Sequence, residues 1–159
     1  MTIDTRNLIV SARLRHDIVL VRIGGLPEIS KVSSGVFSAL EERGIKPILS
    51  VSGNIPGGSE LIFVAEKSSA YDIVQLCGCL RNAYPGLTAD VDGGNVMLVL
   101  NGRTPSDRFA IASFAFDCFA RAGLDADLIN STETAVCCLF PDADGVEQTL
   151  AYEFGIKYV

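Results

Sequence analysis

The chain has 159 residues, of which 48% are hydrophobic and 20% are charged, and its formal net charge is −6. This composition predicts a folded protein that buries a real core, as one compact domain or two small ones. The negative charge argues against nucleic acid as a partner, because basic groups must neutralise its phosphates. No apolar run approaches the ~18 residues that a transmembrane helix needs, and the N-terminus lacks a signal-peptide pattern. We therefore expect no membrane partner.

The cysteines and the single histidine do not indicate a metal site. The cysteines are odd in number, show no paired CxxC spacing and lie far in sequence from His16, so zinc is poorly supported. The Asp-x-Asp pairs at 90–92 and 142–144 lack the ligand pattern of an EF-hand. We expect reduced cysteines acting as small core hydrophobes in a cytoplasmic protein, without metal or cofactor. The five are Cys77, Cys79, Cys118, Cys137 and Cys138.

The first half of the chain follows the order strand, helix, strand, strand, helix, strand. Apolar side chains at helical spacing predict the first helix, and Gly44 is its expected C-terminal cap. The turn GNIPGGS predicts a hairpin between the second and third strands. This is the order of a ferredoxin-like module. The elements are expected at residues 17–23, 29–43, 47–52, 60–66, 69–84 and 87–91.

The second half repeats the same pattern, which indicates two similar modules. The first helix ends with Phe37, Leu40 and Gly44, and a counterpart of equal spacing lies downstream. That counterpart is Phe116, Phe119 and Gly123. The repeated elements are expected at residues 96–102, 106–122, 125–131, 134–140 and around 146–154.

The second module lacks its final strand, because only GIKYV follows its last helix. The segment 7–13, NLIVSAR, has no place in the first module, and we expect it to supply the missing edge strand and so interlock the two. A flexible N-terminal arm is the alternative. The predicted class is therefore α+β, with residues 14–94 as the first module and residues 1–13 plus 95–159 as the second.

The stretch GGLPEISK before the first helix is the main candidate for ligand binding. It does not match the glycine spacing of a phosphate loop, and Glu28 would repel a phosphate. A free amino acid fits better, because its carboxylate can accept from helix N–H groups while Glu28 accepts from its ammonium. An acidic residue in a first helical turn is also favoured by the helix dipole alone.

Taken together, the two units resemble a tandem pair of ACT domains, and more narrowly the C-terminal regulatory region of aspartokinase. That region shows P-D-x-x-G before its first helix, where this chain has Pro27 to Lys31, with Glu28 for the acid and Lys31 for the glycine. The family's L-I-S-T-S-E strand is matched by residues 128–133, LINSTE. The resemblance covers nearly the whole chain.

The resemblance implies an effector site for lysine or threonine that controls aspartokinase activity in aspartate-family amino-acid biosynthesis. It also implies a kinase catalytic domain or subunit as partner, and we expect a homodimer. Lys31 in place of glycine and Pro47 in the second strand depart from the family, and the second module is open to a purely structural role. By position, the implied site residues are Leu26, Pro27, Glu28, Ile29, Ser30, Lys31, Lys46, Ser50, Ser52, Asp125, Asn130 and Ser131.

Two alternatives are compatible with the same residues. One is a freestanding amino-acid sensor, or a dimerisation module whose site has degenerated. The other is a small enzyme with Glu28 or Glu133 as acid or base, because fold alone does not decide function. No catalytic set is predicted, since the carboxylates are isolated and His16 is expected at the surface.

Overall fold

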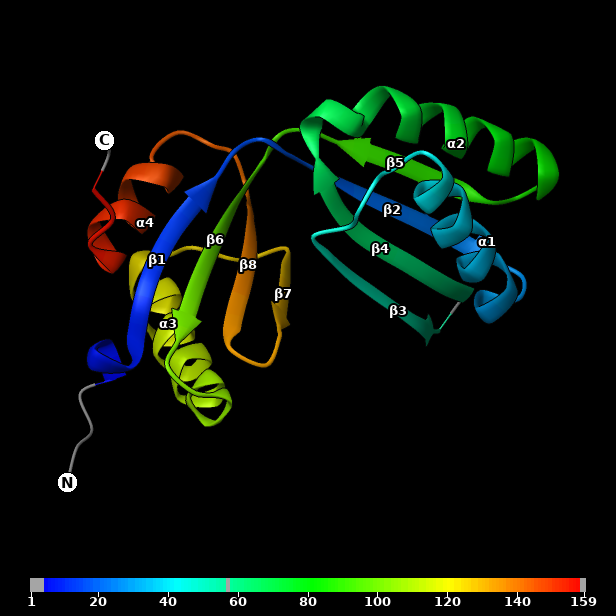
Figure 1. The fold of residues 1–159 in the computed structure, drawn as a ribbon. Coiled ribbons are helices and arrows are strands. Elements are labelled where there is room, and N and C mark those ends of the chain that lie inside the picture. The colour runs from blue at the N-terminus through cyan, green and yellow to red at the C-terminus, as the bar shows by residue number, and fades with distance from the viewer. Residues whose placement is uncertain (1–4, 57, 158–159) are drawn as a thin grey trace. The chain divides into compact units, whose positions relative to one another are not determined.

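The computed structural model describes residues 5–56 and 58–157. The chain divides into two compact units, which we call modules. The first module is Asp17–Gly93, and the second combines Met1–His16 with Gly94–Val159. Each is α+β, with a four-stranded antiparallel sheet and two helices on one face of it (Figure 1). This confirms the predicted pair of βαββαβ modules. None of the helices within the described residues is long and apolar enough to cross a membrane.

The first module has the strand order β3-β4-β2-β5, with β2 and β4 in the centre. Alternate residues of β2, namely Val19, Val21 and Ile23, are buried in the core that both helices cover. Full burial of each such side chain contributes about 1.5–3 kcal/mol. The elements are β2 (Ile18–Leu26), α1 (Ile29–Glu42), β3 (Leu49–Ile55), β4 (Gly58–Glu66), a 3-10 turn (Lys67–Ser69), α2 (Ala70–Ala83) and β5 (Thr88–Asp92).

The second module has the strand order β1-β6-β8-β7. Its core is apolar and includes Phe119 of α3 and Phe140 of β8, whose ring centroids lie 4.9 Å apart. The elements are a 3-10 turn (Thr5–Leu8), β1 (Ile9–Arg15), β6 (Asn95–Gly102), a 3-10 turn (Pro105–Asp107), α3 (Arg108–Ala122), β7 (Leu128–Ser131), β8 (Ala135–Pro141) and α4 (Val146–Phe154).

The N-terminal segment does form the missing edge strand of the second module. β1 pairs antiparallel with β6, and Leu14 lies opposite Leu98. The strand starts two residues later than segment 7–13, because Asn7 and Leu8 belong to the preceding 3-10 turn. The prediction of an interlocked pair is therefore confirmed, and residues 1–4 of the arm lie outside the described residues.

The two modules also end their first helices in the same way. Gly44 and Gly123 both have φ of +69°. The amide of Ile45 donates to the Leu40 carbonyl, and the amide of Leu124 donates to the Phe119 carbonyl, each at 2.9 Å. A left-handed residue after the helix, followed by an apolar one, satisfies the last carbonyls. The repeat read from the sequence is thus a repeat in backbone conformation.

Candidate functional site

The two glycines of the predicted loop serve the packing of the chain on itself. β2 is irregular between Gly24 and Leu26, and Gly25 has a φ of +71°. A Cβ added at Gly25 would lie 2.8 Å from the carbonyl oxygen of Gly86. Only glycine fits a left-handed position this close to another backbone. The glycine pair therefore turns β2 toward α1 and does not form a phosphate cradle.

The start of α1 places opposite charges beside unsatisfied backbone donors. Glu28 occupies the N-cap position in an extended conformation, and its side chain does not cap the helix. Its carbonyl accepts from the Val32 amide at 3.0 Å, whereas the amides of the first turn have no intrahelical partner by geometry. The Glu28 Oε2 and Lys31 Nζ atoms lie 3.8 Å apart and both side chains are exposed. This turn offers N–H donors, a carboxylate and an ammonium.

The tip of the β3–β4 hairpin lies at the same end of the sheet as this loop. Leu26 of β2 is opposite Ser59 of β4, and Ser59 is opposite Asn54 of β3. The Ser59 hydroxyl donates to the Asn54 Oδ1 at 2.5 Å. Glu60 lies one position further in, opposite Gly24. Sequence reasoning missed these polar neighbours, although the hairpin turn that positions them was predicted.

The remaining predicted residues of the first module lie at increasing distance from the loop. Ser52 is opposite Leu61, a core residue, so it faces the helix side near the loop end of β3. Ser50 lies further along the same face. Lys46 follows the C-terminus of α1, a helix of 14 residues and hence about 21 Å long. Residues 26–31 are contiguous at the start of α1, Ser52 lies on β3 with β4 between it and β2, and Lys46 lies at the opposite end of α1.

Lys46 instead borders two small hollows of about 250 and 220 Å³. Phe37, Glu41 and Pro47 line the first, and Glu66 and Ser69 line the second. Both volumes are below the ~300–1,000 Å³ typical of small-molecule sites.

The second module closes the corresponding loop with its own side chains. Thr104 and Asp107 form a capping box, in which the Thr104 amide donates to the Asp107 Oδ2 at 3.0 Å. Asn130 and Ser131 lie on the edge strand β7, whereas Asp125 lies beyond the C-terminus of α3. The first module makes no such side-chain cap at Glu28, whereas the helical turn that leads into α3 is closed by the chain itself.

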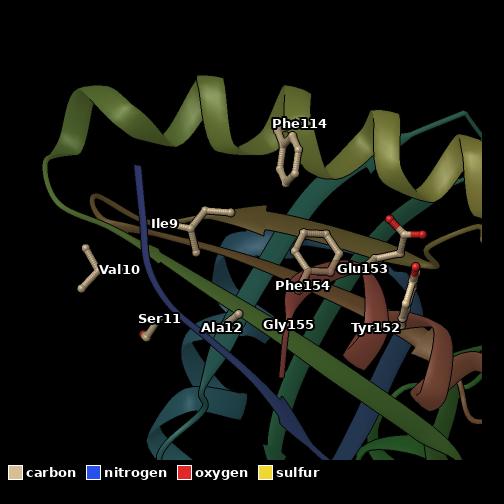
Figure 2. A pocket seen from close by; sticks show the side chains of 9 residues that line it. All are labelled: Ile9, Val10, Ser11, Ala12, Phe114, Tyr152, Glu153, Phe154 and Gly155. Atoms are coloured by element: carbon tan, nitrogen blue, oxygen red, sulfur yellow. The ribbon is translucent and has the colours of Figure 1, made fainter. Parts of the chain in front are cut away.

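A larger hollow of about 590 Å³ lies beside β1 in the second module. Figure 2 shows the Ile9, Phe114 and Phe154 side chains turned into it. It lies where α4 ends after nine residues, whereas α2 continues for 14. Among its lining residues Glu153 supplies a carboxylate, but no basic side chain is present. A free amino acid would find no cation there for its own carboxylate, so this hollow fits a zwitterion less well than the α1 loop.

A second hollow of about 590 Å³ continues along β1 toward the start of α4. Arg13, His16, Lys157 and Glu147 contribute to its lining. The His16 Nε2 and Glu147 Oε1 atoms lie 3.4 Å apart, so two of these charged groups already face each other. His16 is 45% exposed, consistent with a surface residue.

The thiols offer no activated nucleophile. All five cysteines are free, and four of them are buried. Burial raises the pKa of Cys77, Cys118 and Cys137, and it raises the pKa of Cys138 to about 12. Such thiols stay protonated at neutral pH and react slowly. Within residues 5–56 and 58–157 no three His, Cys, Asp or Glu side chains are placed to hold a metal ion.

Comparison with known proteins yields structural matches only. No protein-family model and no curated protein sequence matches the chain. The regulatory subunit of aspartate kinase from Thermus thermophilus, in its ligand-free form, is 19% identical with a TM-score of 0.80, over 92% of this chain and 97% of that one. Aspartate kinase from Synechocystis is 16% identical with a TM-score of 0.77, over 96% and 28%. E. coli aspartokinase III in complex with lysine and aspartate is 16% identical with a TM-score of 0.67, over 93% and 33%.

These similarities concern the fold. The chain spans nearly the whole length of a separate regulatory subunit, but only about a third of the E. coli kinase chain. The resemblance stated from the residues is therefore matched in three dimensions along both modules. This chain has the tandem ACT-type fold seen in the regulatory part of aspartate kinases.

Proposed function

We propose that this chain is a non-catalytic regulatory unit that binds a small amino acid, lysine or threonine, and controls the activity of an aspartate kinase. The observation that carries the proposal is the length of the structural match. A separate regulatory subunit is covered almost from end to end, with a TM-score of 0.80. The described residues also contain no assembled set of a nucleophile, a base and a residue that orients it, which weighs against the small enzyme as an alternative.

The effector site we propose is the start of α1 with the adjoining hairpin. The effector carboxylate accepts from the amides of the first turn, at Ile29 and Ser30, where the helix dipole favours negative charge. Its ammonium is held by the Glu28 carboxylate, and Lys31 supports the carboxylate. Asn54 and Ser59 offer further hydrogen bonds from the neighbouring strands.

The mechanism we propose is a population shift. An effector that binds one arrangement of the regulatory unit more tightly than another favours that arrangement, and the kinase partner responds to the change. Such coupling is typically worth about 1–3 kcal/mol, or a 5- to 150-fold change in an equilibrium. It requires no chemistry on this chain.

Thermal unfolding in the presence of each of the twenty amino acids tests the proposal. Lysine or threonine should raise the Tm selectively, by about 5–10 °C near 100-fold Kd, because ligand that binds only the folded state adds about 2.7 kcal/mol. Lysine is tested first, because the compared E. coli structure holds lysine together with aspartate. A flat response to all twenty would favour a dimerisation module with a degenerate site.

Two matched variants locate the site. Glu28→Ala should abolish most of the lysine or threonine shift while leaving the Tm without effector nearly unchanged, because Glu28 is exposed and caps nothing. Glu153→Ala, in the hollow beside β1, should leave the shift intact. The reverse result would move the site to that hollow, and unfolding of the Glu28 variant would make Glu28 a structural residue.

The regulatory role has a separate test. The chain is mixed with aspartate kinase catalytic subunits, and aspartyl phosphate formation is followed with and without the effector. An effector-dependent change in rate supports control of the kinase. A Tm shift without any change in rate would favour the freestanding sensor.

A further inference from the structure

The hollow beside β1 exists because α4 is shorter than its counterpart in the first module. β1 occupies the edge of its sheet that β5 occupies in the first module. α2 has 14 residues and α4 has nine, so the last five residues of α2 have no equivalent in α4. In the first module Leu80 and Tyr84, at the end of α2, pack against the core. The same space in the second module stays open between residues 9–12 and 152–155.

Two phenylalanine rings form the apolar wall of this hollow (Figure 2). The ring of Phe114 on α3 and the ring of Phe154 on α4 meet edge to face, with their centroids 6.1 Å apart. The Phe154 ring also lies 5.9 Å from the ring of the buried Phe119, so the core holds it in place. The volume of about 590 Å³ is within the ~300–1,000 Å³ typical of small-molecule sites. The hollow therefore has the size and the surface to take an apolar body of several carbon atoms.

One carboxylate stands at this hollow without a basic partner. Glu153 is half-buried at the end of α4, and none of the described residues that line the hollow is basic. Among the side chains that the structure describes, none forms an ion pair with Glu153. A charge that is partly removed from water interacts more strongly with an opposite charge than it does at an open surface. Glu153 can therefore hold a cation.

The end of α4 adds negative potential at the same place. The amide of Ile156 donates to the Ala151 carbonyl at 2.8 Å, whereas the carbonyls of Glu153 and Phe154 have no intrahelical partner by geometry. The negative end of the helix dipole favours positive charge there. The faces of aromatic rings also attract cations, and Tyr152 places a third ring beside Glu153. The carboxylate, the helix end and the rings thus favour a ligand of the same sign.

We propose that the hollow beside β1 binds an organic ammonium ion, an amine with an apolar body and without a carboxylate. The ammonium donates to the Glu153 carboxylate and to the free carbonyls at the end of α4, and the apolar body lies against Phe114 and Phe154. A carboxylate on the ligand would be repelled, so free amino acids bind poorly. This inference goes beyond the proposed function and does not rest on it.

The neighbouring hollow along β1 shows that this preference belongs to the end of α4. Its volume is also about 590 Å³, but Arg13, His16 and Lys157 contribute to its lining. Its carboxylate, that of Glu147, already faces His16 at 3.4 Å. An ammonium ion would meet basic groups there. The two hollows therefore differ in charge although they are similar in size.

Three probes of similar shape and different charge test the proposal. The whole chain, labelled with 15N, is titrated at pH 7 with phenethylamine, 2-phenylethanol and 3-phenylpropionate, and amide shifts are followed by NMR. Phenethylamine, which is protonated at this pH, should bind with a Kd of roughly 1 mM, as expected for a ligand of this size. The alcohol should bind about fivefold more weakly, and the carboxylate at least about tenfold more weakly. The shifts should concentrate at residues 9–12 and 152–155.

Matched variants separate charge from shape. Glu153→Gln should weaken phenethylamine binding about fivefold and leave 2-phenylethanol unchanged, because it removes the charge and keeps the size of the side chain. Glu147→Gln is the control, since this carboxylate lies six residues earlier, about 9 Å along α4, and lines the other hollow. It should change the Kd less than about twofold. Ala12→Leu should weaken both probes, because a larger side chain on β1 fills the hollow.

Several outcomes would overturn the proposal. These are equal affinity for the three probes, shifts centred elsewhere, an unchanged Kd for phenethylamine in Glu153→Gln, or an equal loss in Glu147→Gln. Circular dichroism checks that each variant is folded. If Ala12→Leu unfolds, the pair of glutamine variants still decides. The lysine or threonine response is measured separately through Glu28, so its failure is distinguishable from failure of the ammonium site.

Discussion

The two modules share a fold but treat the start of their first helix in opposite ways. In the first module Glu28 stands at the N-cap without capping, and the first turn of α1 faces solvent with one acid and one base beside it. In the second module Thr104 and Asp107 form a capping box at the 3-10 turn that leads directly into α3, and α3 itself has no side-chain cap at Asp107. A helix N-terminus is satisfied either by the chain itself or by something that binds to it. The comparison favours the first module as the binding module and the second as its structural support.

The largest expected effect comes from the loop glycines. Gly25→Ala should lower the free energy of unfolding by about 3 kcal/mol, because it combines a left-handed backbone with a Cβ 2.8 Å from the rigid Gly86 carbonyl. Gly102→Ala should cost less, about 1–2 kcal/mol, because its φ is ordinary, although its Cβ would lie 2.7 Å from the Cδ1 atom of the buried Ile111. Urea unfolding of both variants measures the difference. Equal losses of unfolding free energy in the two variants would contradict this difference between Gly25 and Gly102.

The buried Cys138 thiol should make the stability of the second module depend on pH in the alkaline range. The Cys138 thiol in β8 keeps its proton to about pH 12, whereas in the unfolded chain it ionises near 9. A raised pKa in the folded state means that its contribution is intact below pH 9 and lost as pH rises toward 12. Unfolding free energy should therefore fall between pH 9 and 10, by on the order of 1 kcal/mol from this group.

Replacement of Cys138 isolates that contribution. Cys138→Ala should flatten the slope of unfolding free energy against pH between 9 and 10, although it lowers stability at every pH by leaving a cavity. Cys79→Ala, at the exposed cysteine of α2, is the control and should leave the slope as in the parent chain. An unchanged slope in Cys138→Ala would mean that the thiol is reached by solvent in the folded state.

Loss of the capping box should lower the free energy of unfolding at neutral pH by about as much as ionisation of Cys138 does at alkaline pH, on the order of 1 kcal/mol. Thr104→Ala removes the side chain that accepts from the backbone at Asp107, and the expected cost is about 1 kcal/mol. The matched change in the first module, Glu28→Ala, should cost close to nothing because no side-chain cap is lost. Chemical denaturation of the two variants in parallel checks the contrast between the modules. A cost at Glu28 equal to that at Thr104 would contradict it.

Much of the fold was predictable because local periodicity and strand counting are strong signals. Helical spacing located α1 and α3 to within two residues at their starts, and the unplaced segment before the first module identified β1 as a borrowed edge strand. The repeat of Gly44 at Gly123 was visible because only a left-handed cap requires glycine there. These features depend on residues close in sequence or on simple topology.

The candidate site was less predictable because it depends on register. The pairing of Leu26 with Ser59 and of Ser59 with Asn54 brings the hairpin to the loop, and no spacing within the sequence encodes it. The hairpin also extends closer to its tip than predicted, since Ile55 pairs with Gly58. One signal was available and unused: Thr104 to Asp107 is a T-x-x-D pattern of the kind that closes a helix start.

The smallest expected effect on stability tests the comparison most directly. Glu28→Ser should give α1 the cap that it lacks, because the extended backbone at this position suits a serine hydroxyl that accepts from the amide two or three residues later. Stability should rise by about 0.5 kcal/mol, while the Tm shift with lysine or threonine should fall, because the hydroxyl takes the donor that the effector carboxylate would use. Thermal unfolding with and without effector measures both. If the variant gains stability and also keeps its full response, the open start of α1 is incidental and the effector binds elsewhere. If instead the response disappears as stability rises, the contrast between the two modules is the reason that one of them binds.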